Sequence, residues 1–342
     1  MKKFGNILVL AALALMSLCG CSGTTEEFPV TLEADVLVIP ADGAAKVTFT
    51  VYEGNADVTA DAKIVDALTG DVLDGAVFST VNSGEYVFYA EYASKKSEQV
   101  KVMAEEVTVV SQFVRNICLM EFTDASCTFC PDASIYVDRN ILQKNPNVHL
   151  MSFHEKDAWA LPQFQILATK FKLTATPYAV VDMREGMSLE QGARDKVKEA
   201  ITASANTYPA HCAVAVSSVK DAQGKAAVEV KLYSEKAADY YLAVYVVEDG
   251  IIGYQKHGSI EYQDYYHQFV TRKMISQTVY GDKLGIVQAS TEKTVNYSIS
   301  VDADWNLANT YVYALAMDAN GYVNNMQVCL LDGGNAGYEY KN

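Results

Sequence analysis

The sequence predicts a multidomain protein of the β plus α/β class, in which two β-rich parts flank one α/β part. Short runs that alternate apolar and polar residues fill 30–105, and strand–helix–strand alternation follows over 107–208. Short strands return over 210–342. The chain of 342 residues is too long for one compact domain, and its 50% hydrophobic content excludes wholesale disorder.

The first 20 residues are expected to be a signal peptide. Lys2 and Lys3 form a basic start, and the apolar run that follows over 7–18 is shorter than the roughly 20 residues that span a bilayer. Leu18 to Cys21 resembles the cleavage box of bacterial lipoproteins. The resemblance implies that Cys21 carries the lipid and that 21–29 is a polar segment beside the membrane. The alternative is an ordinary cleaved signal whose cysteines are incidental.

The net charge bears on the expected partners, and the residues after Cys21 bear on the expected cellular location. The net charge of −15 repels nucleic-acid phosphates, so no nucleic-acid partner is expected. In many Gram-negative bacteria an Asp directly after the lipidated Cys marks retention in the inner membrane. Ser22 stands at that position here, and by this resemblance the expected destination is the outer membrane. Glu26 and Glu27 resemble the surface-export signal of one Gram-negative phylum. We expect an outer-membrane protein anchored through lipidated Cys21, with its body facing the periplasm or the cell surface.

Residues 30–105 are expected to form an immunoglobulin-like β-sandwich. The segment from Asn82 to Tyr86 resembles the approach to strand F of that fold, where a Tyr caps a corner and an inward residue follows two positions later. Phe88 stands at that inward position instead of Cys, so no inter-sheet disulfide is expected. We interpret this domain as a spacer between the membrane and the next domain.

The α/β part begins with a near-continuous apolar run, which is typical of a strand buried on both faces. Strands are expected at 117–122, 148–153 and 176–182. Helices are expected from the end of the segment 126–131 to about 144, at 162–172 and at 188–206. No strand is expected between Asp182 and the last helix.

The motif that carries chemistry is Cys127-Thr-Phe-Cys130, which follows a buried strand and opens a helix. Free N–H groups and the positive end of the helix dipole stabilise a thiolate, so the pKa of Cys127 should fall below about 8.5 and make it the nucleophile. Cys130 lies one turn further on, close enough to form a disulfide. Two alternatives stay open: a zinc half-site, for which a second ligand pair is missing, and an inert structural disulfide.

The segment from Leu119 to Cys130 resembles the strand-to-active-site segment of the thioredoxin superfamily. The resemblance implies a thioredoxin-like domain over 107–208 that exchanges disulfides with protein thiols and needs no cofactor or metal. It implies that Glu121 is a buried acid that relays a proton for the second Cys. It also implies that Thr176 and Pro177 form a cis-proline loop facing the motif, although cis X–Pro bonds are a minority of about 5–6%.

Residues 210–342 are expected to form a second β-sandwich. Its strands are expected at 214–219, 227–232, 240–247, 294–301, 311–317 and 322–331. The Tyr-rich stretch between about 253 and 287 is expected to be irregular. Cys212 and Cys329 could form a structural disulfide in an oxidising compartment.

A lipoprotein signal, a CxxCP motif and a β-rich end together resemble the family named after a twenty-eight-kilodalton outer membrane protein. The segments 241–249, 266–274 and 280–282 resemble its C-terminal signature. The resemblance covers 107–342 and implies an outer-membrane location, not a defined reaction. Two hypotheses follow: a thiol–disulfide oxidoreductase, or a non-enzymatic surface binding or adhesion lipoprotein that uses the thioredoxin fold as a scaffold.

Overall fold

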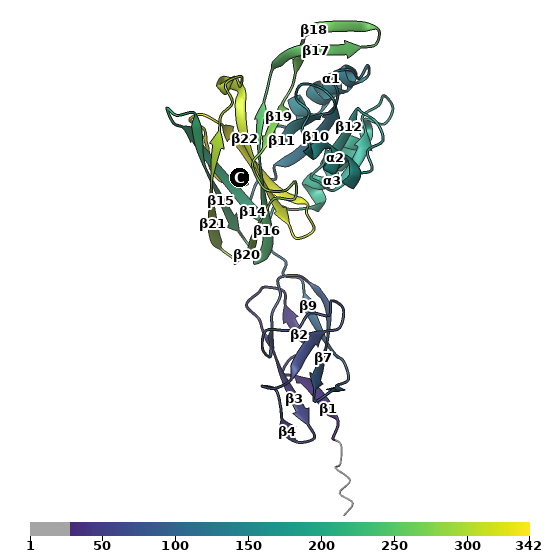
Figure 1. Cartoon of the computed structure of the whole chain (residues 1–342), viewed down its shortest axis with the longest axis vertical. Helices are drawn as coiled ribbons and strands as arrows, with labels where there is room; N and C mark the ends of the chain where they lie inside the picture. Colours follow the sequence, from purple (N-terminus) through teal and green to yellow (C-terminus); the bar gives the residue numbers. More distant parts are fainter. Residues whose placement is uncertain (1–27) are drawn as a thin grey trace, which may run out of the picture.

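The computed structural model describes residues 28–342, in which a small N-terminal β domain joins a larger body at one end (Figure 1). The expected signal peptide and Cys21 lie outside the described residues, as does most of the polar segment 21–29. Within 28–342, no helix has the length and apolar character needed to cross a membrane.

The N-terminal domain consists of two sheets that enclose one core. One sheet has the order β1-β3-β4 with β6 beside β3, and the other has the order β2-β9-β7-β5 with β8 beside β7. The strands are β1 (Val30–Ala34), β2 (Val38–Pro40), β3 (Val47–Glu53), β4 (Ala56–Asp57), β5 (Lys63–Asp66), β6 (Val77–Phe78), β7 (Gly84–Tyr92), β8 (Lys95–Lys96) and β9 (Val100–Glu105).

The corner expected at Tyr86 is present. The Tyr86 hydroxyl donates to the backbone oxygen of Asn82 at 2.9 Å, four residues upstream, as in a tyrosine corner. Phe88, the expected inward residue, is fully buried, and its ring centroid lies 5.0 Å from that of Phe49 across the core. A local sequence signal therefore places both the turn and the core residue correctly.

The α/β part is built around β10, every residue of which is buried, as its continuous apolar run predicts. Met120 and Phe122 pack on one face with helix α2, whereas Ile117 and Leu119 pack on the other face with helices α1 and α3. The elements are β10 (Ile117–Thr123), α1 (Cys130–Asn140), a 3₁₀ turn (Leu142–Lys144), β11 (Val148–His154), α2 (Gln163–Lys170), β12 (Tyr178–Val181), β13 (Glu185–Ser188) and α3 (Asp195–Thr207).

The expectation that no strand follows Asp182 is wrong. Strand β13 pairs antiparallel with β12, and the turn between them closes with Arg184 N–H donating to Val181 O at 2.9 Å. Asp182 and Met183 both have positive φ angles, of 48° and 58°. A two-residue hairpin turn with positive φ at both positions normally has the sequence Asn-Gly or Asp-Gly. The pair Asp182-Met183 does not match these sequences, so the sequence did not predict the turn. The last helix consequently begins at Asp195, later than the expected 188.

The C-terminal part forms two sheets over a shared core. One is a four-stranded sheet of order β21-β15-β14-β24, and the other contains β19, β16, β22 and β23, with β20 beside β16. The strands are β14 (Cys212–Lys220), β15 (Lys225–Ser234), β16 (Ala238–Glu248), β17 (Ile251–His257), β18 (Ile260–His267), β19 (Val270–Met274), β20 (Asp282–Val287), β21 (Thr291–Ser300), β22 (Thr310–Asp318), β23 (Val323–Leu330) and β24 (Asn335–Ala336); a 3₁₀ turn spans Leu307–Asn309.

The α/β part and the C-terminal part share one continuous sheet. Strand β19 lies parallel to β11 at the pair Ser152 and Val270, and Ser152 N–H donates to Phe269 O at 2.7 Å. The joined sheet has the order β13-β12-β10-β11-β19-β16-β22-β23. The boundary expected near 208–210 therefore separates two stretches of sequence but not two separate sheets.

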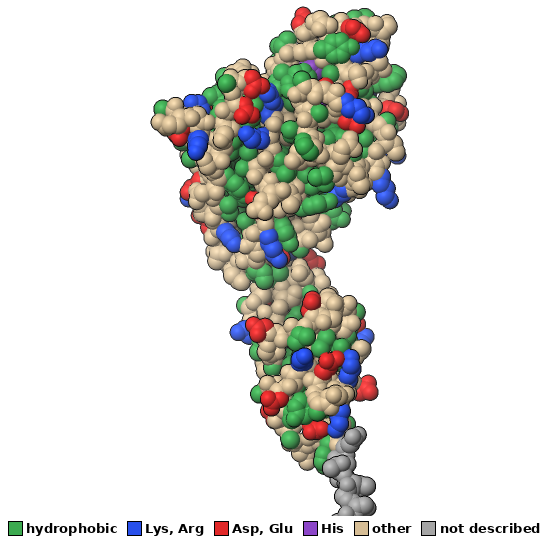
Figure 2. Space-filling view, viewed as in Figure 1, with side chains coloured by type: hydrophobic (Ala, Val, Ile, Leu, Met, Phe, Trp, Pro, Cys, Tyr) green, Lys and Arg blue, Asp and Glu red, His purple; other side chains and the backbone are tan. Residues whose placement is uncertain are grey.

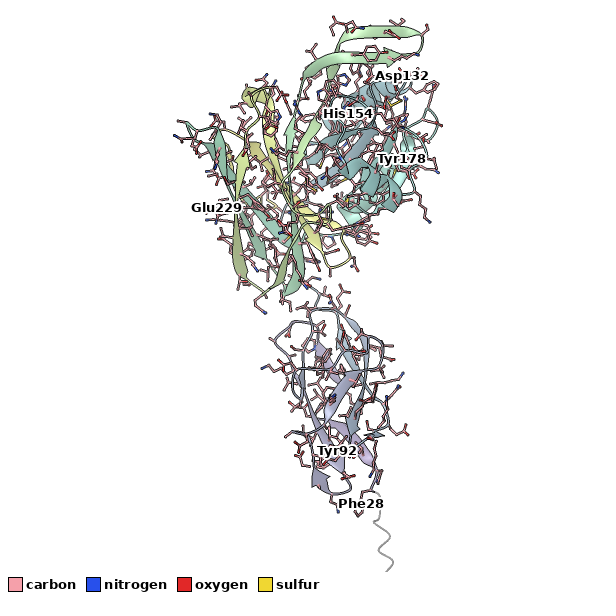
Figure 3. The ribbon with its side chains drawn as sticks, in the orientation of Figure 1. Phe28, Tyr92, Asp132, His154, Tyr178 and Glu229 are labelled. Atoms are coloured by element: carbon pink, nitrogen blue, oxygen red, sulfur yellow. A yellow bond between two sulfur atoms is a disulfide. The ribbon has the colours of Figure 1, made fainter. Side chains whose placement is uncertain are left out.

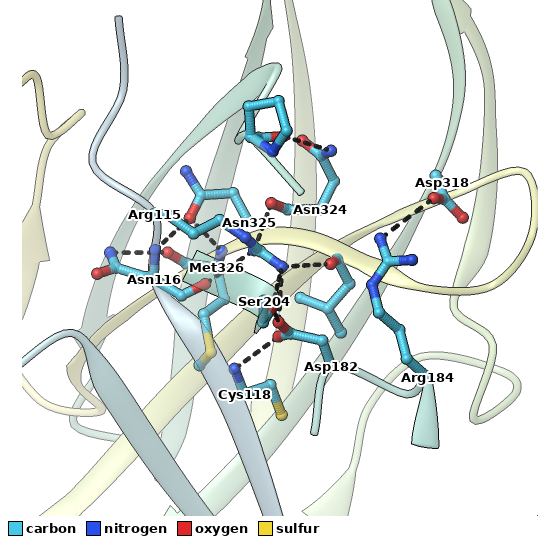
Figure 4. Close-up of polar contacts among 12 residues, drawn as sticks. Arg115, Asn116, Cys118, Asp182, Arg184, Ser204, Asp318, Asn324, Asn325 and Met326 are labelled. Carbon is cyan, nitrogen blue, oxygen red and sulfur yellow. Dashed lines mark hydrogen bonds and ion pairs between the residues drawn. The ribbon is translucent and has the colours of Figure 1, made fainter. Parts of the chain in front are cut away.

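A buried ion pair fixes the two parts to each other (Figure 4). The Arg115 guanidinium donates to Asp182 Oδ2 at 2.6 Å and to the backbone oxygen of Val323, on β23, at 2.9 Å. Asp182 also accepts from Ser204 Oγ on α3 and, at 2.9 Å, from Cys118 N–H on β10. One carboxylate thus connects β10, α3 and, through Arg115, the C-terminal sheet.

The possible disulfide between Cys212 and Cys329 is not formed. Both are free, buried cysteines on β14 and β23, as is Cys118 on β10. The Cys212 thiol instead lies 3.2 Å from Asn324 Oδ1, to which it donates. The expectation that 253–287 is irregular is also wrong, because strands β17 to β20 occupy most of this stretch.

Candidate functional site

The two cysteines of the CxxC motif are joined by a disulfide between β10 and α1, with their Cα atoms 5.5 Å apart. Cys130 is buried, whereas Cys127 is only half-buried, so the sulfur of Cys127 is the more accessible one. Helix α1 begins at Cys130, with Pro131 in its first turn. Cys127 therefore lies in the turn before the helix and not in the helix itself.

The expected proline loop faces the motif. The Thr176–Pro177 peptide bond is cis, and the Thr176 backbone oxygen lies 3.7 Å from Cys127 Sγ. Strand β12 starts at the next residue and pairs antiparallel with β10, which leads into the motif. The sheet thus brings together residues that lie almost 50 positions apart in the chain.

Glu121, the expected buried acid, is 1% exposed on β10. Its Oε1 accepts from Ser134 Oγ at 2.9 Å. Ser134 lies four residues after Cys130 on α1, so both side chains share the helix face that covers Glu121. Burial raises the pKa of Glu121 to about 7, which leaves the carboxyl partly protonated at neutral pH.

A hairpin from the C-terminal part, β17–β18, crosses over the motif and over α1 (Figure 1). The buried side-chain amide of Gln255 donates to Cys127 O at 3.0 Å and to Asp124 O at 3.3 Å. Two backbone bonds accompany it, from Lys256 N–H to Ala125 O at 2.8 Å and from Gly258 N–H to Thr128 O at 3.1 Å. The hairpin therefore holds the loop that carries Cys127.

The rings of His154, Trp159 and His267 pack against one another, and Figure 3 labels His154 among them. His154 Nδ1 lies 2.6 Å from Asp157 Oδ2, and that oxygen accepts from Ala125 N–H in the motif loop at 3.1 Å. The rings of Trp159 and His267 lie 4.5 Å apart. Burial, with the neighbouring His154, lowers the pKa of His267 to about 4, so this ring is neutral at neutral pH.

These contacts extend the site beyond the residues that the sequence indicated. Gln255 and His267 come from the stretch expected to be irregular, whereas His154 ends β11 and Asp157 follows it, with no recognisable motif spacing. Only the fold brings them to the motif, so no local pattern could have found them. Among residues 28–342, no group of three or more His, Cys, Asp or Glu side chains is arranged to hold a metal ion.

The surface around the motif is apolar in places and mixed in charge. Phe129, between the two cysteines, is 64% exposed, and Ile252 and Ile260 on the hairpin are 59% and 56% exposed. Acidic and basic side chains are interspersed over the visible face of the molecule (Figure 2).

Comparisons with known proteins support part of this description. None of the curated proteins compared with the chain matches it. Domains 4–9 of surface layer protein SbsC align over 89% of this chain and 50% of that chain, at 10% identity and with a TM-score of 0.21. HBP35 of Porphyromonas gingivalis aligns with a TM-score of 0.56 at 20% identity, over 65% of this chain and 77% of that chain, which shows a similar fold.

The family model described as outer membrane protein Omp28 matches residues 165–331. The match begins after the CxxC motif and includes the cis-proline loop, the β17–β18 hairpin and β23. The family resemblance expected from the sequence is therefore supported over 165–331, a stretch in which this chain is similar to the Omp28 outer membrane proteins.

Proposed function

We propose that this protein is a lipid-anchored thiol–disulfide oxidoreductase of the outer membrane, built on a thioredoxin-like domain. The observation that carries the proposal is the disulfide between half-buried Cys127 and buried Cys130, placed against the Thr176 backbone oxygen. The buried Glu121 carboxyl bonds to Ser134, one helical turn after Cys130. Exchange chemistry needs one accessible sulfur, one protected resolving sulfur and a nearby proton carrier.

The proposed reaction moves two electrons between the cysteine pair and a substrate. In the reductive direction, the Cys127 thiolate attacks one sulfur of a substrate disulfide, forms a mixed disulfide and releases the other substrate sulfur as a thiolate. The Cys130 thiolate then attacks Cys127 Sγ, which restores the intramolecular disulfide and releases the second substrate thiolate. Run in reverse, the same steps oxidise two substrate thiols.

Glu121 and the proline loop have separate roles in this proposal. A carboxyl with a pKa of about 7 can accept the proton of the Cys130 thiol near neutral pH and return it. Thr176 and Pro177 present a backbone edge to an extended substrate beside Cys127. Gln255 acts only as a positioning residue, because it contacts backbone oxygens of the motif loop and not its sulfurs.

The proposed location rests on the sequence and on the family match. The Omp28 model names an outer membrane protein, and the lipoprotein signal with Cys21 supplies the anchor. The N-terminal domain then acts as a spacer, since it precedes the larger body in the chain and extends away from it (Figure 1). The body faces the periplasm or the cell surface.

A second candidate is a surface binding or adhesion lipoprotein in which the motif is only a structural disulfide. The exposed apolar side chains of Ile252 and Ile260 favour it, because such side chains on a projecting hairpin suit contact with another protein. In that case the activity of the protein would not depend on Cys127.

The two candidates are separated by replacing each cysteine of the pair. With a peptide disulfide as substrate in a thiol buffer, we expect Cys127→Ser to reduce exchange to the rate of the buffer alone. We expect Cys130→Ser to accumulate a mixed disulfide with the substrate, visible on a non-reducing gel, because the resolving thiol is missing. The matched control is Cys118→Ser, a buried thiol outside the motif. Exchange that survives Cys127→Ser would refute the oxidoreductase proposal.

A further inference from the structure

A cleft of about 610 Å³ lies where the N-terminal domain meets the larger body. Residues 81–83 line it from the N-terminal domain, and Tyr208 and Asp239 line it from the body. The two parts approach closely here, since a Cβ at Gly43, which has a φ of +70°, would lie 3.6 Å from the Ala237 Cβ. The volume falls within the range of about 300–1,000 Å³ that is usual for small-molecule sites.

One wall of the cleft is held in place by stacked side chains. The Arg184 guanidinium contacts two aromatic rings, with its Cζ 3.8 Å from the Tyr208 centroid and 4.4 Å from the Tyr322 centroid. Asp318 Oδ2 lies 3.9 Å from the guanidinium (Figure 4). These two cation–π contacts and the nearby carboxylate stabilise the position of the arginine in the absence of a ligand.

Three side chains that line this cleft keep a buried polar atom without a partner. Among the described residues, nothing hydrogen-bonds to Arg184 Nε, His211 Nδ1 or Asp239 Oδ1. Roughly nine in ten buried polar groups are paired in folded proteins, so three such atoms in residues of one cleft mark a wall whose polar groups the protein itself does not fully pair. Burial lowers the pKa of His211 to about 4, so its neutral ring offers one donor and one acceptor.

The cleft is lined by both acidic and basic side chains, so its charges favour neither an anion nor a cation. The carboxylates of Glu106, Asp239 and Asp318 line the cleft together with the cations of Arg184 and Lys236. Neutral donors and acceptors add to them, from the side chains of Asn82, Ser83 and Asn320. Hydroxyl groups both donate and accept, so a ligand rich in hydroxyls can pair with carboxylate, amide and guanidinium together. The Tyr208 side chain, 40% exposed, adds a flat apolar surface.

We propose that this cleft binds a neutral carbohydrate of one to three sugar units. Arg184 and Asp239 would pair with its hydroxyls from the larger body, and the 81–83 loop would close on it from the N-terminal domain. Binding would hold the two domains in one arrangement. The site is separate from the CxxC motif, so this inference does not depend on the redox proposal.

The test is calorimetric titration of the purified full chain in detergent with a panel of neutral mono-, di- and trisaccharides. We expect saturable binding of at least one sugar, weakened about tenfold or more by Asp239→Asn, which removes a charged acceptor. Ser83→Trp, at an exposed loop position, should block the cleft without disturbing the fold. Asp71→Asn, on the exposed surface of the N-terminal domain, is the matched control, and it and Cys127→Ser should leave the affinity unchanged.

Two results would overturn the inference. One is the absence of binding across the panel, and the other is binding that survives both Asp239→Asn and Ser83→Trp. A zwitterionic dipeptide titrated in parallel should give no saturable heat. If the dipeptide alone binds, the cleft is a site for a different class of ligand and the carbohydrate proposal is wrong.

Discussion

Replacing Asp182 with Ala is expected to lower the free energy of unfolding of the larger body by about 3–5 kcal/mol, the usual cost of removing one partner of a buried ion pair. The substitution leaves the Arg115 guanidinium buried without its carboxylate and removes the acceptor of Cys118 N–H. The loss should appear in guanidinium chloride unfolding followed by tryptophan fluorescence. Both tryptophans, Trp159 and Trp305, lie in the larger body, so the signal excludes the N-terminal domain.

The matched control is Asp195→Ala, which removes an 85% exposed carboxylate paired with Lys198 at 3.4 Å. An exposed pair of this kind contributes about 0–1 kcal/mol, so little change is expected. The double variant Arg115→Met with Asp182→Leu should be more stable than Asp182→Ala alone, because no charge remains buried and unpaired. Equal stability of Asp182→Ala and Asp195→Ala would mean that the pair does not hold the two parts together.

Glu121→Gln is expected to stabilise the protein at alkaline pH. The pKa of Glu121 is raised from 4.5 to about 7 on folding, mainly by burial. Between these values the folded state binds more protons than the unfolded state, so stability falls as the pH rises. The difference corresponds to about 3 kcal/mol, which is lost progressively from pH 4.5 to pH 7 and stays lost above it. Gln has no such ionisation and avoids the loss.

The measurement is the free energy of unfolding of both proteins from pH 4.5 to pH 8, with the disulfide intact. The stability of Glu121→Gln relative to the wild type should rise by about 3 kcal/mol over this range. The control is Glu199→Gln, which makes the same chemical change at an exposed position of α3. Its free energy of unfolding relative to the wild type should not change with pH. If the difference in free energy of unfolding between Glu121→Gln and the wild type also does not change with pH, the pKa of Glu121 is not raised by burial in the folded state.

The sequence predicted those features that depend on local patterns. The apolar run at 117–122 predicted a strand buried on both faces, and β10 has that environment. Asn82 to Tyr86 predicted the corner that the Tyr86 hydroxyl now closes. For the candidate site, the motif was visible in a short segment, whereas the cis bond at Pro177 and the burial of Glu121 were expected only from the resemblance to the thioredoxin superfamily.

The features that escaped prediction depend on contacts between distant parts of the chain. Strand β18 is exposed at nearly every position, so its sequence carries no alternation of buried and exposed residues that would predict a strand. The continuous sheet is joined at a single pair, Ser152 and Val270, which no local pattern encodes. The contact of Gln255 with the motif loop therefore became visible only in the folded chain.

The central claim is that Cys127 and Cys130 exchange disulfides with other proteins. Its most direct test is the reduction potential of the pair, measured by alkylating the full chain after equilibration in thiol buffers of defined potential. The proposed function predicts a value between about −120 and −270 mV, the range from strong oxidants to thioredoxin, and the value indicates the direction of electron flow. A potential below about −300 mV, or a pair that never reacts with the buffer, would contradict the claim and identify a structural disulfide.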